Sequence, residues 1–511
     1  MVPRARRAHE RPAPRASRHH ARGRARPAHR AGRGPRTRVR GRGAPAWTVA
    51  RRGHPGLSLL PRAVHGRDRK CRAPARPRVG AGRTPLRGGG PRARSRDPRA
   101  HRRAPIAVSD PKALAQRAIK AIDERRDALF ALSRAIHAKP ELAYEEREAA
   151  IRITEFLEGA GFAVERGYKN VETSYRGDAK GRGPGPTVAI LQEYDALAEI
   201  GHACGHNLIA MIGVAASVGV RAVMDQLPGK LAAIGTPAEE GGGGKVALIR
   251  AGGFDDVDVA MMIHPTSGRS LAGRHSLASN RVMVEFRGKS AHAASQPDLG
   301  INALDGVLQL FNNVNAMRQQ LRPDARVHGI ITNGGSAANV IPDYAAARFS
   351  IRALDRRYQQ EVLRRFIACA EGASKATGTK LTVTVNENAG YENMVFSTPL
   401  ADRWTHHMRT LGIQVFEARD DERVGSTDMG NVMQVLPAIH PYIAISQESI
   451  PGHSTAFREA VAGQEAHENA LVAAKALALT AIDVLADPDV LRKARAEFEE
   501  RRARGIVKGR S

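Results

Sequence analysis

The chain has 511 residues and a formal net charge of +29, a balance typical of nucleic-acid binding proteins. Residues 1–105 hold 32 Lys or Arg side chains and only three acidic ones, so the remainder of the chain is neutral and the charge does not define its function. Three cysteines exclude a disulfide framework and favour a reducing compartment, so we expect the protein in the cytoplasm. No apolar run reaches the roughly 18 residues that span a bilayer, so no membrane span is predicted.

Residues 1–107 consist mainly of Arg, Pro, Gly, Ala and His without any period. Such a segment cannot bury enough apolar surface to offset the entropy of ordering, so we expect it to be disordered. Three interpretations remain open. The segment is a basic tail for nucleic acid or an anionic surface, an Arg-rich transit peptide, or upstream sequence included because the start was assigned too early. Nucleic acid is an expected partner only under the first interpretation.

Residues 108–275 alternate helical and strand patterns, which indicates the first part of an α/β catalytic domain with a mainly parallel sheet and flanking helices. Asp110 and Pro111 predict a helix start, and helical apolar spacing continues to Ile136. The expected elements after it are a helix over 145–159, strands over 162–165 and 187–192 separated by a Gly- and Pro-rich loop over 177–186, a helix over 206–227, a strand over 231–235, a helix ending at 251 and a strand over 257–263.

Residues 276–390 follow a different order. Strand patterns over 281–287, 326–332, 346–354 and 380–386 and helical patterns over 301–321 and 357–376 give β-α-β-β-α-β, the ferredoxin-like arrangement. This order is complete by itself, so it predicts an inserted domain. The catalytic domain resumes over 391–487, with a helix over 399–411, a strand over 439–445 and a helix over 464–485. Residues 488–511 are expected to form a charged helix with a basic end.

A group of metal-binding residue types follows the predicted strands. Cys204 and His206 lie at a strand-to-helix junction, and thiolate and imidazole are ligands that zinc prefers. Two adjacent glutamates cannot point the same way, so one can bind metal while the other acts as a base. Taken singly, such residues are more often solvated or structural, and only their joint placement at strand ends indicates a site. The other candidates are Glu193, Asp195, Glu239, Glu240, His264 and His453.

Six motifs then identify a family resemblance. Together they resemble the aminoacylase/carboxypeptidase-type zinc metallopeptidase family, in the amidohydrolase branch that holds auxin-conjugate hydrolases, p-aminobenzoyl-glutamate hydrolase and β-alanyl-lysine-type dipeptidases. The resemblance covers about residues 112–485 and implies a metal-binding catalytic domain interrupted by a smaller lid and dimerisation domain, and hence a homodimer. The motifs are Glu-Tyr-Asp-Ala-Leu at 193–197, Gly-His-Ala-Cys-Gly-His-Asn at 201–207, Pro-Ala-Glu-Glu-Gly-Gly at 237–242, Gly-Lys-Ser-Ala-His-Ala-Ala at 288–294, Asn-Val-Ile-Pro-Asp at 339–343 and Gly-Ser-Thr-Asp-Met-Gly at 425–430.

The resemblance also implies roles for individual residues. Two divalent ions, zinc or manganese with cobalt as a replacement in vitro, are expected on Cys204, His206, Glu240, His264 and His453. Glu239 is the expected general base and Asp195 orients a ligand. His292 is expected to donate to the oxyanion across a dimer interface, while Asn339 and Arg352 hold the substrate carboxylate.

The predicted function is metal-dependent hydrolysis of the amide bond of an N-acyl or N-aminoacyl amino acid, such as a dipeptide or p-aminobenzoyl-glutamate. Asn207, where the auxin-conjugate type usually has Asp, favours the p-aminobenzoyl-glutamate and β-alanyl-dipeptide group. Three alternatives stay open: a deacylase of the auxin-conjugate or N-acetyl amino acid type, a catalytically silent binding protein on the same fold, and a Cys204 nucleophile. Lys245 follows a glycine run, but Val246 replaces the Ser or Thr of a phosphate loop. His202 receives no role.

Overall fold

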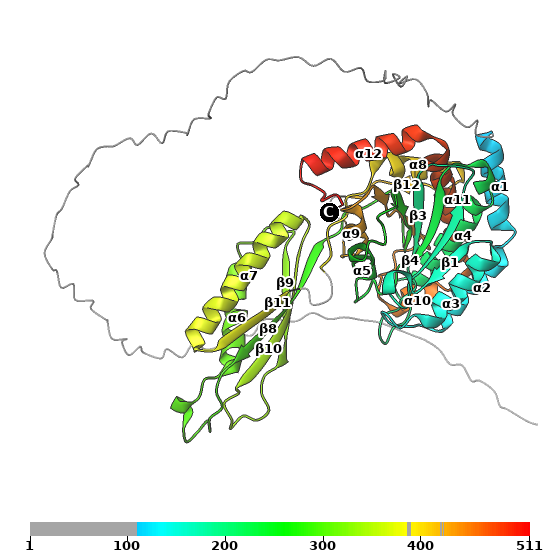
Figure 1. Ribbon diagram of the computed structural model, residues 1–511. Coiled ribbons are helices and arrows are strands. Elements are labelled where there is room, and N and C mark those ends of the chain that lie inside the picture. The colour runs from blue at the N-terminus through cyan, green and yellow to red at the C-terminus, as the bar shows by residue number, and fades with distance from the viewer. Residues whose placement is uncertain (1–109, 386–389, 420–421, 423, 511) are drawn as a thin grey trace, which may run out of the picture. The chain divides into compact units, whose positions relative to one another are not determined.

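The main sheet carries the α/β part of the chain. The computed structural model describes residues 110–385, 390–419, 422 and 424–510, and the predictions for residues 1–107 lie outside this range. The sheet has six strands in the order β1-β2-β4-β3-β5-β13 (Figure 1). Strands β4, β3, β5 and β13 are parallel, and β2 pairs antiparallel with both β4 and the edge strand β1. Its strands are β1 (Ala163–Arg166), β2 (Tyr175–Lys180), β3 (Thr187–Gln192), β4 (Lys230–Gly235), β5 (Val259–Met261) and β13 (Ala438–Ile439).

Helices flank this sheet, as the α/β prediction requires. Asp110 caps the first helix, because its side chain accepts a hydrogen bond from the Lys112 amide. The apolar spacing that continues to Ile136 belongs to two helices, which are separated at residues 124–125. The helices are α1 (Pro111–Asp123), α2 (Arg126–Ala138), α3 (Arg147–Gly159), α4 (His206–Arg221), α5 (Gly244–Arg250), α8 (Thr398–Thr410), α9 (Met429–Met433), α10 (Thr455–Ala460), α11 (Gln464–Ala486) and α12 (Pro488–Ala503).

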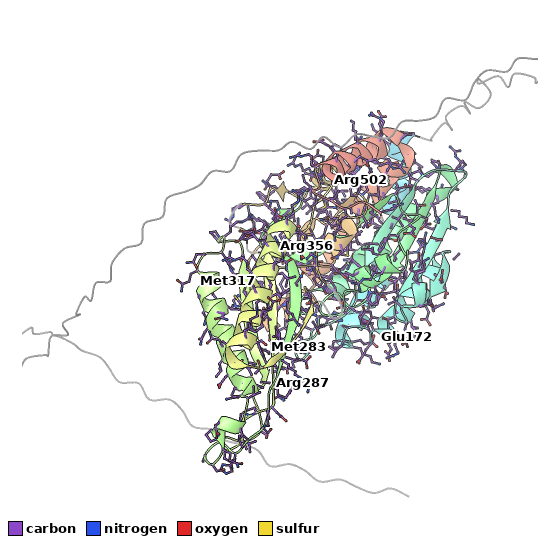
Figure 2. The ribbon with its side chains drawn as sticks, turned by 60° about the vertical axis from the view of Figure 1, so that its left-hand side comes forward. Glu172, Met283, Arg287, Met317, Arg356 and Arg502 are labelled. Atoms are coloured by element: carbon purple, nitrogen blue, oxygen red, sulfur yellow. The ribbon has the colours of Figure 1, made fainter. Side chains whose placement is uncertain are left out.

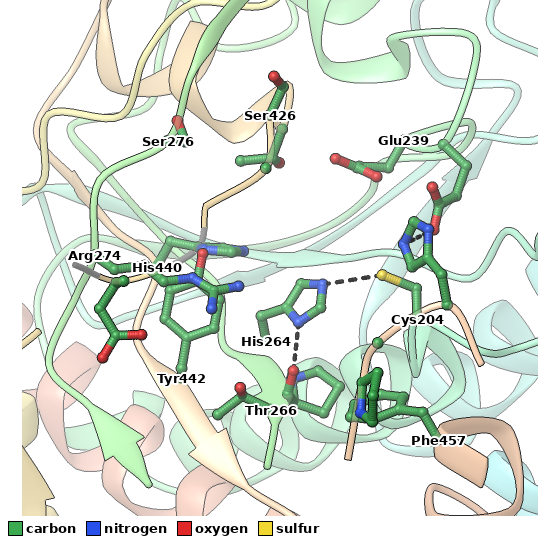
Figure 3. Close-up of a pocket in the computed structure, with 18 of the residues that line it drawn as sticks. Cys204, Glu239, His264, Thr266, Arg274, Ser276, Ser426, His440, Tyr442 and Phe457 are labelled. Carbon is green, nitrogen blue, oxygen red and sulfur yellow. Dashed lines mark hydrogen bonds and ion pairs between the residues drawn. The ribbon is translucent and has the colours of Figure 1, made fainter. Parts of the chain in front are cut away.

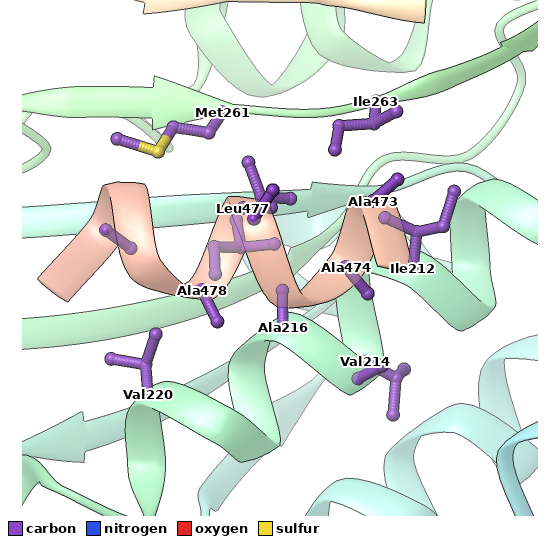
Figure 4. Packing of buried hydrophobic residues seen from close by; sticks show 14 of the residues in the cluster. Ile212, Val214, Ala216, Val220, Met261, Ile263, Ala473, Ala474, Leu477 and Ala478 are labelled. Atoms are coloured by element: carbon purple, nitrogen blue, oxygen red, sulfur yellow. The ribbon is translucent and has the colours of Figure 1, made fainter. Parts of the chain in front are cut away.

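Helix α11 packs against α4 and forms much of the core. Leu477 is fully buried between Ala216 of α4 and Met261 of β5 (Figure 4). By length and composition α11 could also cross a membrane, since an 18-residue window has a mean hydropathy of 1.6, a property that the expectation of no membrane span overlooked. However, 72% of that window is buried inside the protein, which is the behaviour of a core helix.

The inserted region has the predicted β-α-β-β-α-β order. Four antiparallel strands lie in the order β11-β8-β10-β9, with α6 and α7 packed on one face (Figure 1). Side chains alternate along β8: Val282 and Val284 are buried in the core shared with the helices, whereas Met283 and Arg287 belong to the opposite face (Figure 2). The elements are β8 (Ala278–Arg287), α6 (Ala303–Arg318), β9 (Arg326–Asn333), β10 (Tyr344–Ala353), α7 (Arg356–Thr377) and β11 (Lys380–Val385).

Three local predictions were wrong. Strand β2 occupies 175–180, part of which was expected to be a loop. The strand expected over 257–263 is shorter, with β5 over 259–261, and a separate strand, β6, follows it. The strand expected over 439–445 is broken, and its second part, β14, joins β6 in a small sheet of order β12-β7-β14-β6. The residues of the small sheet are β6 (His264–Thr266), β7 (Ser270–Leu271), β12 (Val415–Phe416) and β14 (Tyr442–Ala444). The domain boundaries expected at 275/276, 390/391 and 487/488 stay predictions.

Candidate active site

A cavity of about 670 Å³ lies where the loops after the parallel strands meet (Figure 3). Such loops at the carboxyl ends of parallel strands are where open α/β sheets bind ligands. Four side chains expected to bind metal, Cys204, Glu240, His264 and His453, line the cavity together with Glu239.

The turn before α4 brings Cys204 and His206 into the site. Gly205 has a φ of +82°, which an L side chain rarely adopts, and a Cβ at this position would lie 2.5 Å from Cγ of Pro265. The turn therefore requires glycine. Its close approach to Pro265 also places Cys204 beside His264, with Sγ 3.5 Å from the imidazole Nε2.

Asp195 fixes the orientation of His206. One carboxylate oxygen lies 2.8 Å from His206 Nδ1, and the other accepts a hydrogen bond of 2.9 Å from the Glu240 amide. Burial favours the neutral acid, but the charge and hydrogen bond of His206 outweigh it and lower the pKa of Asp195. With Nδ1 held in this way, the Nε2 atom of His206 is directed towards Glu240, 4.0 Å from Oε1.

His264 and His453 complete the group from two other loops. His264 donates from Nδ1 to the carbonyl oxygen of Pro265 at 2.7 Å, which leaves Nε2 as the atom that faces Cys204 (Figure 3). Burial lowers the pKa of His264 to about 3, so the ring is neutral and its Nε2 can accept a metal. His453 has a φ of +57°, and its Nε2 lies 3.5 Å from Glu240 Oε1.

The donor set fits divalent metal ions. Three overlapping groups have ligand atoms within 4.8 Å of one another: Cys204 with His206 and His264, Cys204 with Glu240 and His453, and His206 with both glutamates. His206 Nε2 and Glu240 Oε1 are buried without a hydrogen-bond partner, which is costly unless a cation occupies the space between them. One thiolate, three imidazoles and a carboxylate are the ligand types of zinc sites.

Glu239 is held in the cavity wall by its backbone. The preceding residue, Ala238, has a φ of +62°, and its amide donates to Glu146 Oε1 at 2.8 Å. The carbonyl of Glu239 accepts a 2.6 Å hydrogen bond from the Tyr391 hydroxyl. Burial and the carboxylates of Glu193 and Asp428 raise the pKa of Glu239 well above its ordinary value. A carboxyl group of raised pKa beside a metal-binding group is suited to accept and return a proton.

Arg352, on β10, also lines the cavity. Its Nε donates to Ser350 Oγ at 3.1 Å, and burial together with the charge of Arg281 lowers its pKa. His292 and Asn339 do not line the cavity. Both are exposed, and the two segments are joined by a hydrogen bond from the Ala293 amide to the Asn339 carbonyl. Their roles stay predictions; a dimer was expected to bring His292 to the site, and Asn339 was expected to hold the substrate carboxylate.

Lys245 is a residue near the site that the sequence did not indicate, and it forms a buried charge network with Glu193 and Asp428. Lys245 is fully buried, and its Nζ contacts Glu193 Oε1 at 2.5 Å and Asp428 Oδ1 at 2.7 Å. A lysine among apolar residues directly after a glycine run was the available signal, and it was considered only as a phosphate loop. His202 is buried, 2% exposed, and burial lowers its pKa to about 3, but it does not line the cavity.

Comparisons with known proteins agree with this geometry. A peptidase dimerisation domain of the M20 family matches residues 274–377. The Xaa-Arg dipeptidase of Mus musculus is 40% identical over 401 residues, which cover 76% of this chain and 92% of that protein. A p-aminobenzoyl-glutamate hydrolase of Escherichia coli is 30% identical over 452 residues, covering 74% of this chain and 94% of that protein.

A solved structure shares the fold. It belongs to a Bacillus subtilis protein described as a dinuclear metal-binding peptidase from the M20 family, with a TM-score of 0.54, 20% identity and coverage of 73% of this chain and 99% of that chain. The dipeptidase and the p-aminobenzoyl-glutamate hydrolase match this chain over more than 90% of their own length. In the structure, Glu239 lies beside the expected metal ligands His206 and Glu240. The chain therefore belongs to the M20 peptidase family and is a metal-dependent hydrolase of amide or peptide bonds.

Proposed function

We propose that the chain hydrolyses dipeptides or N-acyl amino acids and releases a free amino acid, with Glu239 as the general base. The observation that carries this proposal is the buried Glu239 carboxyl group beside His206 and Glu240, two of the expected metal ligands. Similarity to the Xaa-Arg dipeptidase and to the p-aminobenzoyl-glutamate hydrolase supports an amino acid with a free carboxylate as one product.

Two divalent ions would be held by five side chains: Cys204, His206, Glu240, His264 and His453. Thiolate and imidazole donors favour zinc, manganese is the alternative, and cobalt can replace either in vitro. When bound, the ions lower the pKa of water and polarise the carbonyl of the substrate. Asp195 keeps His206 in the tautomer that binds through Nε2.

The protein's own groups account for the proton transfers. Glu239 accepts a proton from the attacking water as the bond between the water oxygen and the carbonyl carbon forms. It then returns that proton to the amine nitrogen as the carbon–nitrogen bond breaks. Its raised pKa suits both transfers, because the protonated form is a usable acid near neutral pH.

Arg352 would bind the substrate carboxylate. It lies in the cavity wall next to Arg281, and two neighbouring guanidinium groups favour an anion between or beside them. Among the described residues, no carboxylate lies within salt-bridge distance of Arg352. A planar guanidinium can therefore offer its remaining donors to the substrate.

We further propose a homodimer in which each site receives His292 and Asn339 from the other subunit. The match of residues 274–377 to a dimerisation domain supports it, as does β9, an edge strand with Ile330 63% exposed and Ile331 42% exposed. A mixture of Glu239→Gln and His292→Ala proteins tests the proposal. Subunit exchange should restore about a quarter of wild-type activity, because half of the dimers contain one intact site. No recovery after exchange contradicts a shared site.

A catalytically silent binding protein and an auxin-conjugate or N-acetyl amino acid deacylase remain the alternatives. The cytoplasm remains the proposed location. One screen separates the functions: release of free amino acid from dipeptides that include Xaa-Arg, from N-acyl amino acids and from p-aminobenzoyl-glutamate, before and after chelation and with zinc or manganese restored. Glu239→Gln should keep its metal content and lose about 10²- to 10⁴-fold in kcat. Retained turnover in this variant contradicts the assigned base.

A further inference from the structure

His440 contributes a buried imidazole to the wall of the cavity. It lies between β13 and β14, is 2% exposed, and lines the cavity together with Tyr442 and Arg274. Figure 3 shows these three side chains on one side of the cavity, opposite Cys204 and Glu239. None of the three takes part in the metal binding or the proton transfers proposed above.

The Nε2 atom of His440 is buried and has no hydrogen-bond partner among the described residues. Two other atoms of the cavity lining share this property, Oε1 of Glu240 and Oγ of Ser426. Glu240 is an expected metal ligand, and a serine hydroxyl can turn towards several partners. The imidazole of His440 has no such freedom, so its unpaired nitrogen is costly unless a ligand in the cavity pairs with it.

The metal centre does not account for this nitrogen. His440 belongs to none of the groups of ligand atoms that lie within 4.8 Å of one another. Its ring packs instead against the rings of His264 and Tyr442, with centroids 5.5 Å and 5.0 Å away. His440 therefore lies beside an expected metal ligand without sharing its ion position. A substrate that fills the cavity is the remaining partner for Nε2.

Tyr442 sets which nitrogen of His440 carries the proton. Nδ1 lies 3.1 Å from the Tyr442 hydroxyl, and the guanidinium of Arg274 lies over the tyrosine ring, 3.9 Å from its centroid. Because the positive charge of Arg274 makes the hydroxyl a stronger donor, Tyr442 donates and Nδ1 accepts. Burial lowers the pKa of His440 well below its ordinary value, so the ring holds one proton, and that proton is on Nε2.

The backbone on both sides of His440 is anchored as well. The carbonyl of Ile439 accepts a hydrogen bond of 3.2 Å from the Met262 amide, and that of Pro441 accepts one of 3.0 Å from the His264 amide. The Nε2–H group is therefore a donor that is already oriented before a substrate enters, which lowers the cost of binding.

We propose that His440 is a substrate-binding residue whose Nε2–H donates a hydrogen bond to an oxygen of the substrate, with Tyr442 and Arg274 as positioning residues. An N-acyl amino acid or a dipeptide offers such acceptors in its amide carbonyl and its carboxylate. This inference rests on the proposed function. It adds a donor from the part of the chain that holds the metal ligands, independent of His292 and Asn339.

Two variants separate the roles of the two ring nitrogens. The side-chain amide of glutamine extends as far from the backbone as Nε2, whereas that of asparagine extends only as far as Nδ1. His440→Gln therefore keeps a donor for the substrate, and His440→Asn keeps only the partner of the Tyr442 hydroxyl. His440→Asn should lower kcat/KM about 5- to 100-fold, because one partner of a buried hydrogen bond is lost, and His440→Gln should stay within about 5-fold of the wild type. Zinc content should be unchanged in both.

The opposite order of activities overturns the proposal, because it means that the contact with Tyr442 matters and the cavity donor does not. Equal losses in the two variants, or wild-type kcat/KM in His440→Asn, overturn it as well. A wild-type protein that releases no amino acid from any substrate of the screen overturns the proposed function instead.

A measurement on the ring itself serves if His440→Asn does not fold. Nitrogen NMR of the protein with isotope-labelled histidine reports which ring atom carries the proton, and the signal of His440 is the one absent from His440→Gln. The wild type should carry the proton on Nε2, the Nε2 signal should shift when a product amino acid is added, and Tyr442→Phe should move protons towards Nδ1. A wild-type ring protonated on Nδ1 overturns the proposal.

Discussion

Replacing Gly205 with alanine tests how tightly the turn at Cys204 is specified. The φ of +82° costs a residue with a Cβ about 1–2 kcal/mol. The new methyl would also lie 2.5 Å from Pro265 Cγ and 3.1 Å from Val461 Cγ1, and relieving such overlap costs about 1–3 kcal/mol. Gly205→Ala should therefore lower the free energy of unfolding by about 2–5 kcal/mol.

The displacement should also reach the metal site. Pro265 must move, and its carbonyl oxygen holds Nδ1 of His264, so the affinity for metal should fall together with stability. Urea unfolding of the metal-free protein measures the first effect, and chelator competition measures the second.

Gly241→Ala is the control for this change. Nothing lies within 4 Å of a Cβ at Gly241, and its φ is not positive, so this variant should stay within about 0.5 kcal/mol of the wild type. If Gly205→Ala were as stable as Gly241→Ala and bound zinc normally, the argument that this turn positions Cys204 and His264 would be refuted.

Three further changes address the core, the substrate and the pH dependence of stability. Leu477→Ala, in the α4–α11 core, should cost about 2–5 kcal/mol of unfolding free energy, whereas Leu308→Ala, 46% exposed on α6, should change it by less than about 0.5 kcal/mol. Arg352→Met should lower kcat/KM about 10- to 100-fold for a substrate with a free carboxylate, because a hydrogen bond to a charged group contributes about 1.5–3 kcal/mol. For the analogue of that substrate with a C-terminal amide in place of the carboxylate, kcat/KM should not change. Equal losses on both substrates contradict the assignment. Burial and Asp195 raise the pKa of Glu146 to about 7, above its ordinary 4.5. As pH rises between these values the unfolded chain loses this proton and the folded one keeps it, so Glu146 should contribute a loss of about 3 kcal/mol to the stability of the metal-free protein, and this contribution should level off above pH 7. Glu146→Gln should make the fall in stability between pH 4.5 and 7 smaller by this amount, and an unchanged pH profile in denaturant titrations contradicts the assignment.

The sequence indicates long periodic elements well. The helices α6, α7 and α11 and the strands β8 to β11 lie within a few residues of their predicted bounds, because each buries one face at a regular spacing. The β-α-β-β-α-β order followed from these elements alone. Strand β2 was missed because Gly177 and the glycines after it resemble a loop, whereas in the structure Gly177 pairs with Val164 of β1 on one side and with Ala233 of β4 on the other.

The charged part of the site was the harder prediction. Cys204, His206, Glu240, His264 and His453 carry recognisable ligand chemistry and lie together in the structure. The Lys245 network has no such mark, because its partners come from positions 52 and 183 residues away. Local pattern cannot report which distant carboxylates neutralise a buried lysine, so its role depends on the tertiary structure.

A His-Pro dipeptide marks the break between β5 and β6 and the break between β13 and β14, and the sequence prediction did not use it. His264-Pro265 begins β6, directly after the strand predicted over 257–263, and His440-Pro441 lies between β13 and β14. Hydrogen bonds continue through both breaks, from the amides of residues 260, 262 and 264 to the carbonyls of 437, 439 and 441. Pro441 has no amide to donate, but its carbonyl accepts the bond from His264, so the proline costs the ladder no donor at this point.

The same pairing positions the imidazole of His264. In the small sheet Tyr442 pairs with His264, and their ring centroids are 5.7 Å apart. The Tyr442 hydroxyl lies 3.1 Å from His440 Nδ1, so a second imidazole is fixed against the first, with ring centroids 5.5 Å apart. The two segments thus pair first in the large sheet and then, beyond the breaks, in the small sheet. This second pairing forms the part of the cavity wall that contains His264. The repeated His-Pro dipeptide is therefore a better guide to this wall than the apolar strand pattern around it.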